Sequence, residues 1–280
     1  MKPAFVLVLA LAAAVPPGLR GRELERLPTR RHEIVLTFDG GDNAVGLPSI
    51  LRTLSRRRVR ATFFVSGQLA RRYPALMRIV GREHEVGNHT WSHPTLTRLS
   101  SAAVTNEIRR GERAIRAATG RDPRPLFRFP YGDRNPRTIR LANRAGYVSI
   151  RWSVDTWGWM GVGRQSVGGV VRRVREGLEP GAIVLMHVGA ARDGSTLDAR
   201  ALPAVIDMVR RRGYSFTTLE RLGQRRQVSA RRSASSTTGR RRPHPRDAPR
   251  GSRHRPSPRA ARSRGARGAP TARVGARRRQ

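Results

Sequence analysis

Cysteine is absent from the 280-residue sequence, lysine occurs once, at Lys2, and there are only 19 acidic residues against 57 basic ones. The lack of cysteine excludes disulfide bonds and thiolate metal sites, so a metal would have to bind histidine, aspartate or glutamate. The net charge of +38 is typical of proteins that bind polyanions, such as nucleic acid, anionic lipid or an acidic cell-wall polymer. Because nearly every base is arginine, a GC-rich genome is an alternative source of the charge.

The last part of the chain, residues 224–280, lacks apolar periodicity. It contains 19 arginines and one acid, Asp247, among serine, proline, glycine and alanine, and so carries +18 of the net charge. Such a segment cannot bury enough apolar surface to offset its chain entropy. We expect a disordered basic tail that binds nucleic acid or an anionic wall polymer without sequence specificity.

The N-terminus has the layout of a secretory signal. Lys2 precedes an apolar run over residues 4–15, and the small residues Ala12 and Ala14 suit a cleavage site. The run is too short to span a bilayer comfortably, although an uncleaved anchor is the alternative. Residues 1–20 are therefore expected to be a signal peptide or anchor, and the protein to be secreted or associated with the cell envelope.

Between residues 31 and 222, short apolar runs alternate with helical stretches. The expected strands are residues 34–38, 61–65, 126–129, 148–154, 182–187 and 215–218, and the expected helices include 49–58, 102–119 and 202–212. Alternation of this kind predicts parallel strands joined by right-handed helical crossovers, and a single domain of this length favours a barrel-like arrangement.

Five chemically capable residues are each expected at or just beyond the carboxyl end of a strand. They are Asp39, His89, Arg128, Asp155 and His187. In a parallel barrel the carboxyl ends of the strands form the rim on which active sites assemble. We therefore expect these side chains to share one site.

The stretch GNHTWSHP places His89 and His93 four positions apart. One helical turn after the strand would bring both imidazoles to the same side, within reach of one metal ion. The alternative is a pair of surface or capping histidines.

The stretch FRFPYGD contains Arg128, Pro130 and Tyr131. A guanidinium at a strand end can clamp a carboxylate, and a rigid proline can hold the next backbone N–H toward a developing oxyanion. The alternative is an ordinary turn in which Arg128 pairs with Asp133.

Two further stretches contain candidate residues. SVDTWGWMG contains Asp155, Trp157 and Trp159, and IVLMHVG contains His187. A buried histidine beside a carboxylate can donate a proton, and indole rings can form a wall for a sugar ring or acyl group. Alternatively, these side chains only pack in the core.

Taken in order, the stretches TFDGG, HTWSH, RFPY, DTWGW and LMH resemble the five motifs of the polysaccharide deacetylase family, the NodB-type carbohydrate esterases of family 4. The family patterns are TFDDG, HxxxH, RxPY, DxxxW and LxH, and the resemblance covers residues 31–222. It implies an α/β fold, a distorted seven-stranded barrel, and removal of acetyl groups from acetylated sugars with a divalent metal, for which zinc is the expected ion.

The resemblance also implies roles for individual residues. Asp39 would be the general base, oriented by Arg128, and Tyr131 would offer its backbone N–H to the oxyanion. Asp155 would tune His187, the general acid that protonates the leaving amine.

The remaining positions concern the metal and the acetyl pocket. His89 and His93 would be metal ligands, while Trp159 and Leu185, together with Tyr131, would line the pocket for the substrate. Amide hydrolysis by an activated water in such a site needs no serine or cysteine nucleophile.

One position departs from the family pattern. The second aspartate of TFDDG, the third metal ligand, is Gly40 here, which has no side chain to offer. Three interpretations are open: Asp42 or Asn43 supplies the missing oxygen, Asp39 itself joins the metal, or the site binds no metal. We expect Asp42 to be the third ligand.

The sequence thus predicts a metal-dependent hydrolase that deacetylates N-acetylated sugar polymers such as peptidoglycan or chitin. The alternatives are an O-acetyl esterase acting on xylan-like polymers and a non-catalytic module that binds cell-wall saccharides. A nucleic-acid role rests on charge alone, and no protein partner is expected.

Overall fold

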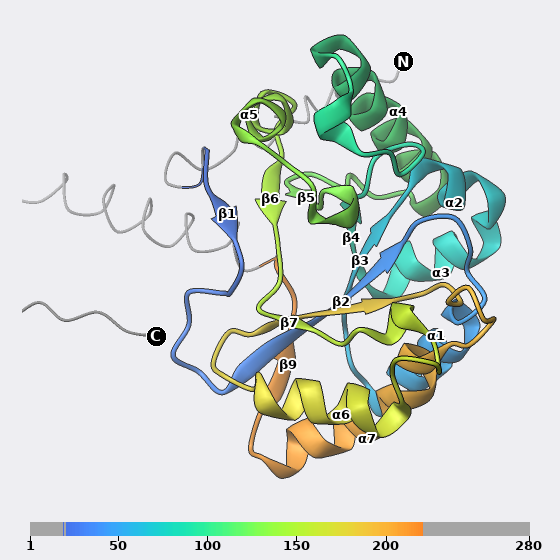
Figure 1. The fold of residues 1–280 in the computed structure, drawn as a ribbon, viewed down its shortest axis with the longest axis vertical. Coiled ribbons are helices and arrows are strands. Elements are labelled where there is room, and N and C mark those ends of the chain that lie inside the picture. The colour runs from blue at the N-terminus through green and yellow to red at the C-terminus, as the bar shows by residue number, and fades with distance from the viewer. Residues whose placement is uncertain (1–18, 20, 221–280) are drawn as a thin grey trace, which may run out of the picture. The chain divides into compact units, whose positions relative to one another are not determined.

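The computed structural model describes residue 19 and residues 21–220 (Figure 1). Nearly all of the predicted signal segment and the whole predicted tail, residues 224–280, lie outside the described residues. Among the helices in the described part, none combines the length and the apolar character needed to cross a membrane.

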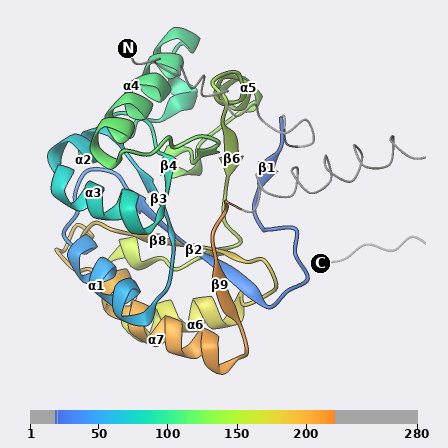
Figure 2. The same cartoon turned by 180° about the vertical axis from the view of Figure 1, so that it is seen from behind.

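The described residues form one curved sheet in which all paired strands are parallel (Figures 1 and 2). The strands are β1 (Glu23–Leu24), β2 (Glu33–Gly40), β3 (Thr62–Val65), β4 (Glu85–Asn88), β5 (Leu126–Phe127), β6 (Val148–Ile150), β7 (Val154–Asp155), β8 (Ile183–His187) and β9 (Ser215–Thr217). Their order is β1-β6-β5-β4-β3-β2-β8-β7, and β9 also pairs with β2.

Strand β2 is the central element because it has neighbours along its whole length. On one side its second half pairs with β3. On the other side its first three residues pair with β9, and residues 35–39 pair with β8. This pairing places Asp39 directly beside His187, the last residue of β8.

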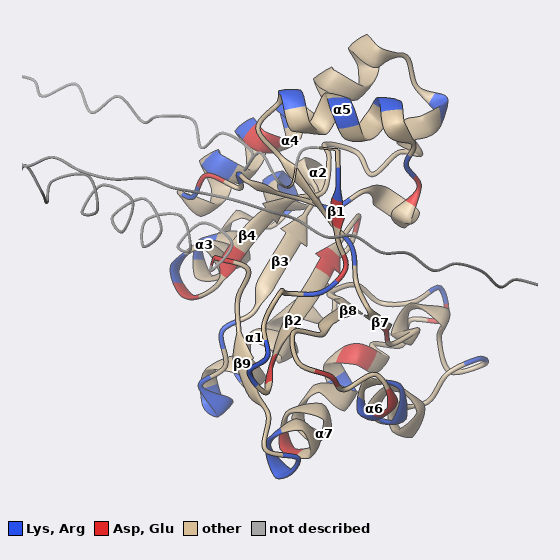
Figure 3. Cartoon of the chain, turned by 90° about the vertical axis from the view of Figure 1, so that its left-hand side faces the viewer, with Lys and Arg blue, Asp and Glu red and all other residues tan. Residues whose placement is uncertain are grey.

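Helices cover the outer face of the sheet, as Figures 1 and 2 show. They are α1 (Leu47–Arg57), α2 (Gly67–Arg72), α3 (Pro74–Glu83), α4 (Ser101–Thr119), α5 (Pro136–Arg144), α6 (Val167–Glu176) and α7 (Leu197–Arg211). Helix α4 shows why they form where they do: Ser100 accepts a hydrogen bond from the Ala103 N–H at its start, and Gly120, with φ +70°, ends it. Basic residues lie mainly on the helices and connecting loops (Figure 3).

Alternation along β2 divides the core into two layers. Ile34, Leu36 and Phe38 belong to the large cluster that packs under the helices, whereas Val35 belongs to a cluster with residues of β3, β5, β6 and β8 on the inner face. Because successive side chains point to opposite faces of a strand, Asp39 points inward and position 40 points toward the helices.

The predicted fold class is confirmed: parallel strands curl into a distorted barrel with helices outside. The six predicted strands are all present. A strand was expected before His89 but no bounds were predicted for it, and the two-residue β1 was not expected; the described part has nine strands rather than seven. The predicted strand at residues 148–154 is divided into β6 and β7 because the carbonyl groups of Ile150 and Arg151 accept hydrogen bonds from the Arg128 side chain.

Candidate active site

A cavity of about 1010 Å³ opens at the carboxyl ends of the strands. Nine of the ten predicted site residues line it: Asp39, Asp42, His89, His93, Tyr131, Asp155, Trp159, Leu185 and His187. The tenth, Arg128, is fully buried and contacts Asp39. The five strand-end residues therefore share one site, as the sequence predicts.

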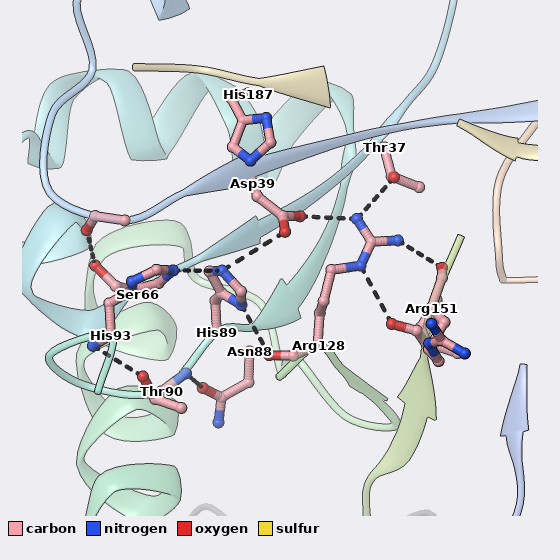
Figure 4. A network of polar contacts seen from close by, with 12 residues as sticks. Thr37, Asp39, Ser66, Asn88, His89, Thr90, His93, Arg128, Arg151 and His187 are labelled. Atoms are coloured by element: carbon pink, nitrogen blue, oxygen red, sulfur yellow. Dashed lines mark hydrogen bonds and ion pairs between the residues drawn. The ribbon is translucent and has the colours of Figure 1, made fainter. Parts of the chain in front are cut away.

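Arg128 holds Asp39 with a guanidinium that donates four hydrogen bonds (Figure 4). Its Nη1 donates to Asp39 Oδ1 at 2.7 Å and to Thr37 Oγ1 at 2.8 Å. Nε donates to the Ile150 carbonyl at 3.2 Å and Nη2 to the Arg151 carbonyl at 3.0 Å. The alternative pairing with Asp133 is wrong, because Asp133 accepts hydrogen bonds from Thr97 instead.

The charges around Asp39 keep it ionised. Burial alone favours the neutral acid, but the Arg128 guanidinium, followed by His89 and His187, outweighs burial and holds the pKa of Asp39 below its ordinary value. Asp39 is therefore a carboxylate at neutral pH and can accept a proton.

His89 and His93 converge through a loop, not through a helical turn. Thr90 and His93 have φ angles of +71° and +59°, and the His93 N–H donates to Thr90 Oγ1 at 3.0 Å. This left-handed path brings the two Nε2 atoms to 3.1 Å from each other. The expected helical turn is wrong, but the expected convergence is present.

The contacts of the two rings define their protonation. His89 Nδ1 lies 2.8 Å from the Arg128 carbonyl, which can only accept, so Nδ1 carries the proton and Nε2 keeps its lone pair. Burial lowers the pKa of His93 to about 3, helped by repulsion from His89, and burial also lowers the pKa of His89. Both rings are neutral at pH 7, as a metal ligand must be.

Helix α4 fixes the loop that carries these histidines. Glu107 accepts hydrogen bonds from the N–H groups of Trp91 and Ser92 at 3.1 and 2.9 Å, and from Ser92 Oγ at 3.0 Å. At Gly111 a Cβ atom would lie 2.6 Å from the Thr90 carbonyl, so only glycine allows the helix to approach this closely. Sequence reasoning missed both residues because their partners are distant in sequence.

The third metal ligand is not assembled. Position 40 faces the helices, and a Cβ there would lie 2.5 Å from Leu69 Cδ2 and 3.0 Å from Val188 Cγ2, in apolar surroundings. Within the described residues, no three histidine, aspartate or glutamate side chains form a group that could hold a metal ion. Two imidazoles fit a divalent metal, but the usual set of three protein ligands is not found in the described part of the chain.

The prediction that Asp42 is the third ligand stays a prediction, and in this structure the Asp42 side chain has a different contact. Its Oδ1 accepts from Asn43 Nδ2 at 3.3 Å. Asn43 in turn anchors the loop, since its Oδ1 accepts from the N–H groups of Ala190 at 2.7 Å and Val45 at 3.4 Å. Asp39 Oδ2, at 3.6 Å from His89 Nε2, is the carboxylate that stands beside the two imidazoles.

His187 ends β8 on the opposite side of Asp39 from Arg128 (Figure 4). Burial disfavours its charged form, but the carboxylates of Asp198, Asp39 and Asp155 outweigh burial and raise the pKa of His187. The predicted partner, Asp155, uses its Oδ1 to accept from the Trp157 N–H at 2.9 Å. Asp198 was not predicted, although it lies 3.7 Å from His187 Nδ1.

Aromatic side chains form the wall of the cavity. Tyr131 and Trp159 are 71% and 50% exposed, which leaves their rings available to a sugar. Tyr131 also packs edge-on against His93, with ring centroids 4.5 Å apart. Tyr131 is the second residue of a single turn (Pro130–Gly132), and an N–H at the start of such a turn has no acceptor inside it. Leu185 is buried at the base of the cavity.

The site therefore holds an anionic carboxylate and a histidine that favours its protonated form, side by side at one cavity. Two titratable groups whose surroundings push their pKa values apart are the usual basis of an acid and base pair. The neighbouring strand ends keep both groups fixed. Such an arrangement can remove a proton from water and deliver another to a leaving group.

Comparisons with known proteins agree with this geometry. A family model described as polysaccharide deacetylase matches residues 26–150. The chitooligosaccharide deacetylase of Bradyrhizobium sp. is 37% identical over 199 residues, 68% of this chain and 90% of that protein. The peptidoglycan-N-acetylglucosamine deacetylase of Listeria monocytogenes is 35% identical over 216 residues, 76% of this chain, and the match spans only 44% of the Listeria protein.

A solved structure bears on whether a site in this fold is active. A family 4 carbohydrate esterase from Bacillus anthracis that is described as a pseudoenzyme is 28% identical to this chain, with a TM-score of 0.65 over 72% of this chain and 69% of that one. A mutant of the same protein is described as having restored enzymatic activity. Similarity to this fold is thus compatible with both an active and an inactive site.

Proposed function

Since the chain belongs to the polysaccharide deacetylase family, we propose that it removes acetyl groups from N-acetylated sugar polymers such as peptidoglycan or chitin-like chains. The observation that carries the proposal is the pairing of Asp39, held by Arg128, with the adjacent His187, whose pKa nearby carboxylates raise. An amide needs an activated water, a stabilised oxyanion and a proton for its nitrogen, because it is a poor electrophile with a poor leaving group.

The chain's own residues can perform these steps. Asp39 accepts a proton from water as the water oxygen attacks the acetyl carbonyl carbon, and the Tyr131 N–H donates to the resulting oxyanion. His187 then gives its proton to the amine nitrogen as the C–N bond breaks, so that acetate and a free amine leave. Trp159 and Leu185 supply apolar surface for the sugar face and the acetyl methyl group.

A divalent metal, with zinc as the expected ion, would be held by His89 and His93. Catalytic zinc usually has three protein ligands, so two imidazoles alone would bind it weakly. For this reason none of the steps above depends on a metal.

One observation favours a second function, a saccharide-binding module without turnover. Gly40 removes a ligand that the family pattern supplies, and the apolar side chains of Leu69 and Val188 occupy the space next to it. The pseudoenzyme from Bacillus anthracis is a related protein described as inactive. The cavity and its exposed aromatic rings would suit sugar binding in either case.

The remaining parts of the proposal rest on sequence. We infer export to the cell envelope from the apolar N-terminal segment, and attachment of the basic tail to an anionic wall polymer from its charge of +18. Protease protection in fractionated cells would test the first. Sedimentation with teichoic acid at increasing salt would test the second, because a charge-driven complex dissociates as salt screens it.

Acetate release by the full chain is the direct test. We expect release from N-acetylglucosamine hexamer or peptidoglycan, with less from acetylated xylan, and loss of release in Asp39→Asn. Asp207→Asn is the matched control, because Asp207 lies on α7 and pairs with Arg57 at the end of α1. Polymer binding that survives Asp39→Asn, with no acetate released by any form even after zinc is added, would identify a binding module instead.

A further inference from the structure

His187 stands between carboxylates that come from two different elements, Asp155 on β7 and Asp198 on α7. We propose that Asp198 is the positioning residue that orients His187 and fixes the location of its proton, and that Asp155 is not. The role of this proton in catalysis rests on the proposed deacetylation, whereas the orientation of His187 and the location of its proton do not.

Asp198 is held rigidly against His187. Its side chain is 3% exposed, and its Oδ2 accepts from the His187 N–H at 2.9 Å and lies 3.7 Å from His187 Nδ1. Its Oδ1 accepts from Thr156 Oγ1 at 2.7 Å. A Cβ atom at Gly158 would lie 2.3 Å from the same oxygen, so the backbone of the following turn packs directly on the carboxylate.

The surroundings of Asp198 also fix its orientation. It is the second residue of α7, so its backbone is held by the first turn of the helix. With donors on both oxygens, the carboxylate is kept in one orientation.

Asp155 has other contacts. Its Oδ1 accepts from the N–H of Trp157, two residues further along the chain. In the part of the chain that the structure describes, it forms no hydrogen bond or ion pair with His187, and its attraction is the weakest of the three carboxylates that raise the pKa of that ring. Burial raises the pKa of Asp155, which makes it a poorer anion for an imidazolium.

The consequence concerns the tautomer of His187. Nδ1 is buried and has no hydrogen-bond partner, so the Asp198 carboxylate is the group that stabilises a proton there. When Nδ1 carries a proton, Nε2 is the ring nitrogen that can exchange a proton with a molecule in the cavity. When the imidazolium gives its Nε2 proton to the leaving amine, the Nε2–H bond breaks, an amine N–H bond forms, and the neutral ring retains Nδ1–H.

Several charged groups face this ring and must be considered together. Asp39 from β2, Asp155 from β7 and Asp198 from α7 attract a proton to it, while burial of the ring opposes protonation. His89, on the loop after β4, would repel a charged His187 but is itself kept neutral. Among these groups, Asp198 is the one whose carboxylate lies against the ring nitrogen opposite the cavity.

Nitrogen NMR of histidine-labelled full chain tests the inference without any need for turnover. The chain has seven histidines, and the His187 signals are assigned by their loss in His187→Gln. In the unmodified protein we expect neutral His187 to be the Nδ1–H tautomer. Asp198→Asn should lower the pKa of His187 by about one pH unit or more, and Asp155→Asn should lower it less.

Two outcomes would overturn the inference: a neutral Nε2–H tautomer in the unmodified protein, or a larger pKa shift in Asp155→Asn than in Asp198→Asn. The tautomer measurement needs no variant, so it decides the matter even if Asp198→Asn does not fold. A protein that shows the expected tautomer and shifts but releases no acetate would refute the proposed activity and leave the positioning role of Asp198 intact.

Discussion

Arg128 binds His89 and Asp39 with different parts of the same residue. Its backbone carbonyl accepts from His89 Nδ1 at 2.8 Å, while its Nη1 donates to Asp39 Oδ1 at 2.7 Å. One strand end thereby fixes both the tautomer of a histidine and the direction of the carboxylate, so a disturbance of Arg128 reaches both groups.

Replacement of Arg128 should therefore be costly. Arg128→Met removes the cation but keeps the apolar stem, and it leaves Asp39 buried without its partner. We expect the free energy of unfolding in urea to fall by about 3 kcal/mol or more, together with loss of acetate release. Arg113→Met, on the exposed face of α4, is the control and should change stability by less than about 0.5 kcal/mol. Equal effects would contradict the prediction.

An aspartate at position 40 should not by itself create a tighter metal site. Gly40→Asp meets Leu69 Cδ2, the flexible end of a side chain, so we combine it with Leu69→Ala to provide space. We expect calorimetry to show the same zinc affinity as in the unmodified chain, because the new carboxylate points toward the helices and away from His89 and His93. Gly40→Ala with Leu69→Ala is the control that has the same cavity without the carboxylate. Zinc binding at least about 10-fold tighter in the aspartate variant than in this control would contradict the prediction and identify the carboxylate as a third ligand.

The pH dependence of kcat/KM should follow the two shifted groups. The reaction needs Asp39 ionised and His187 protonated. Because the pKa of Asp39 is lowered from 3.8 and that of His187 is raised from 6.5, the rate should be constant at weakly acidic pH, between the two pKa values. It should fall as pH rises through the raised pKa of His187. A rate that increases steadily up to pH 9 would mean that His187 works as a base.

A buried acid at the other end of the barrel should make stability depend on pH. Burial raises the pKa of Glu85 to about 7 from 4.5, against hydrogen bonds from Thr62 and the Leu219 N–H. Between these values the folded chain binds more protons at this site than the unfolded chain does. Glu85 therefore contributes stability that is present below pH 4.5 and is lost as pH rises toward 7.

Glu85→Gln removes this contribution while it preserves a side-chain acceptor. We compare the free energies of unfolding of the variant and the unmodified chain, measured in urea. As pH rises from 5 to 7.5, the difference should change by about 2 kcal/mol in favour of the variant. His84, whose pKa burial lowers to about 4, contributes the opposite trend in both proteins and cancels in the difference. Glu176→Gln on exposed α6 should show no such gain; a gain there would trace the effect to net charge.

The order of strands and the strand-end residues could be predicted because apolar runs and period-two alternation are local signals. The bounds of strand β4 could not be predicted because its sequence, EVGN, has only one large apolar residue. The helical turn over His89 and His93 was wrong because two residues in it take positive φ angles, which a spacing of four cannot reveal.

The contacts that complete the site are long-range and leave little trace in the sequence. Asp198 and Glu107 lie 11 and 15 or more positions from the groups that they bind, and each is an ordinary acid on an amphipathic helix. The position of Gly40 could have been deduced. Since Phe38 packs outward and Asp39 inward, strand alternation already directs position 40 away from the two histidines.

The pairing of β2 has a consequence for synthesis of the protein. This central strand is made early, yet both of its neighbours on one side, β8 and β9, come from residues 183–217. One edge of the strand therefore stays open while most of the domain leaves the ribosome, and Asp39 cannot meet His187 until then. The sheet closes around β2 only when its last strand is delivered, so until then the emerging chain carries an unpaired apolar strand edge, the kind of edge that favours aggregation.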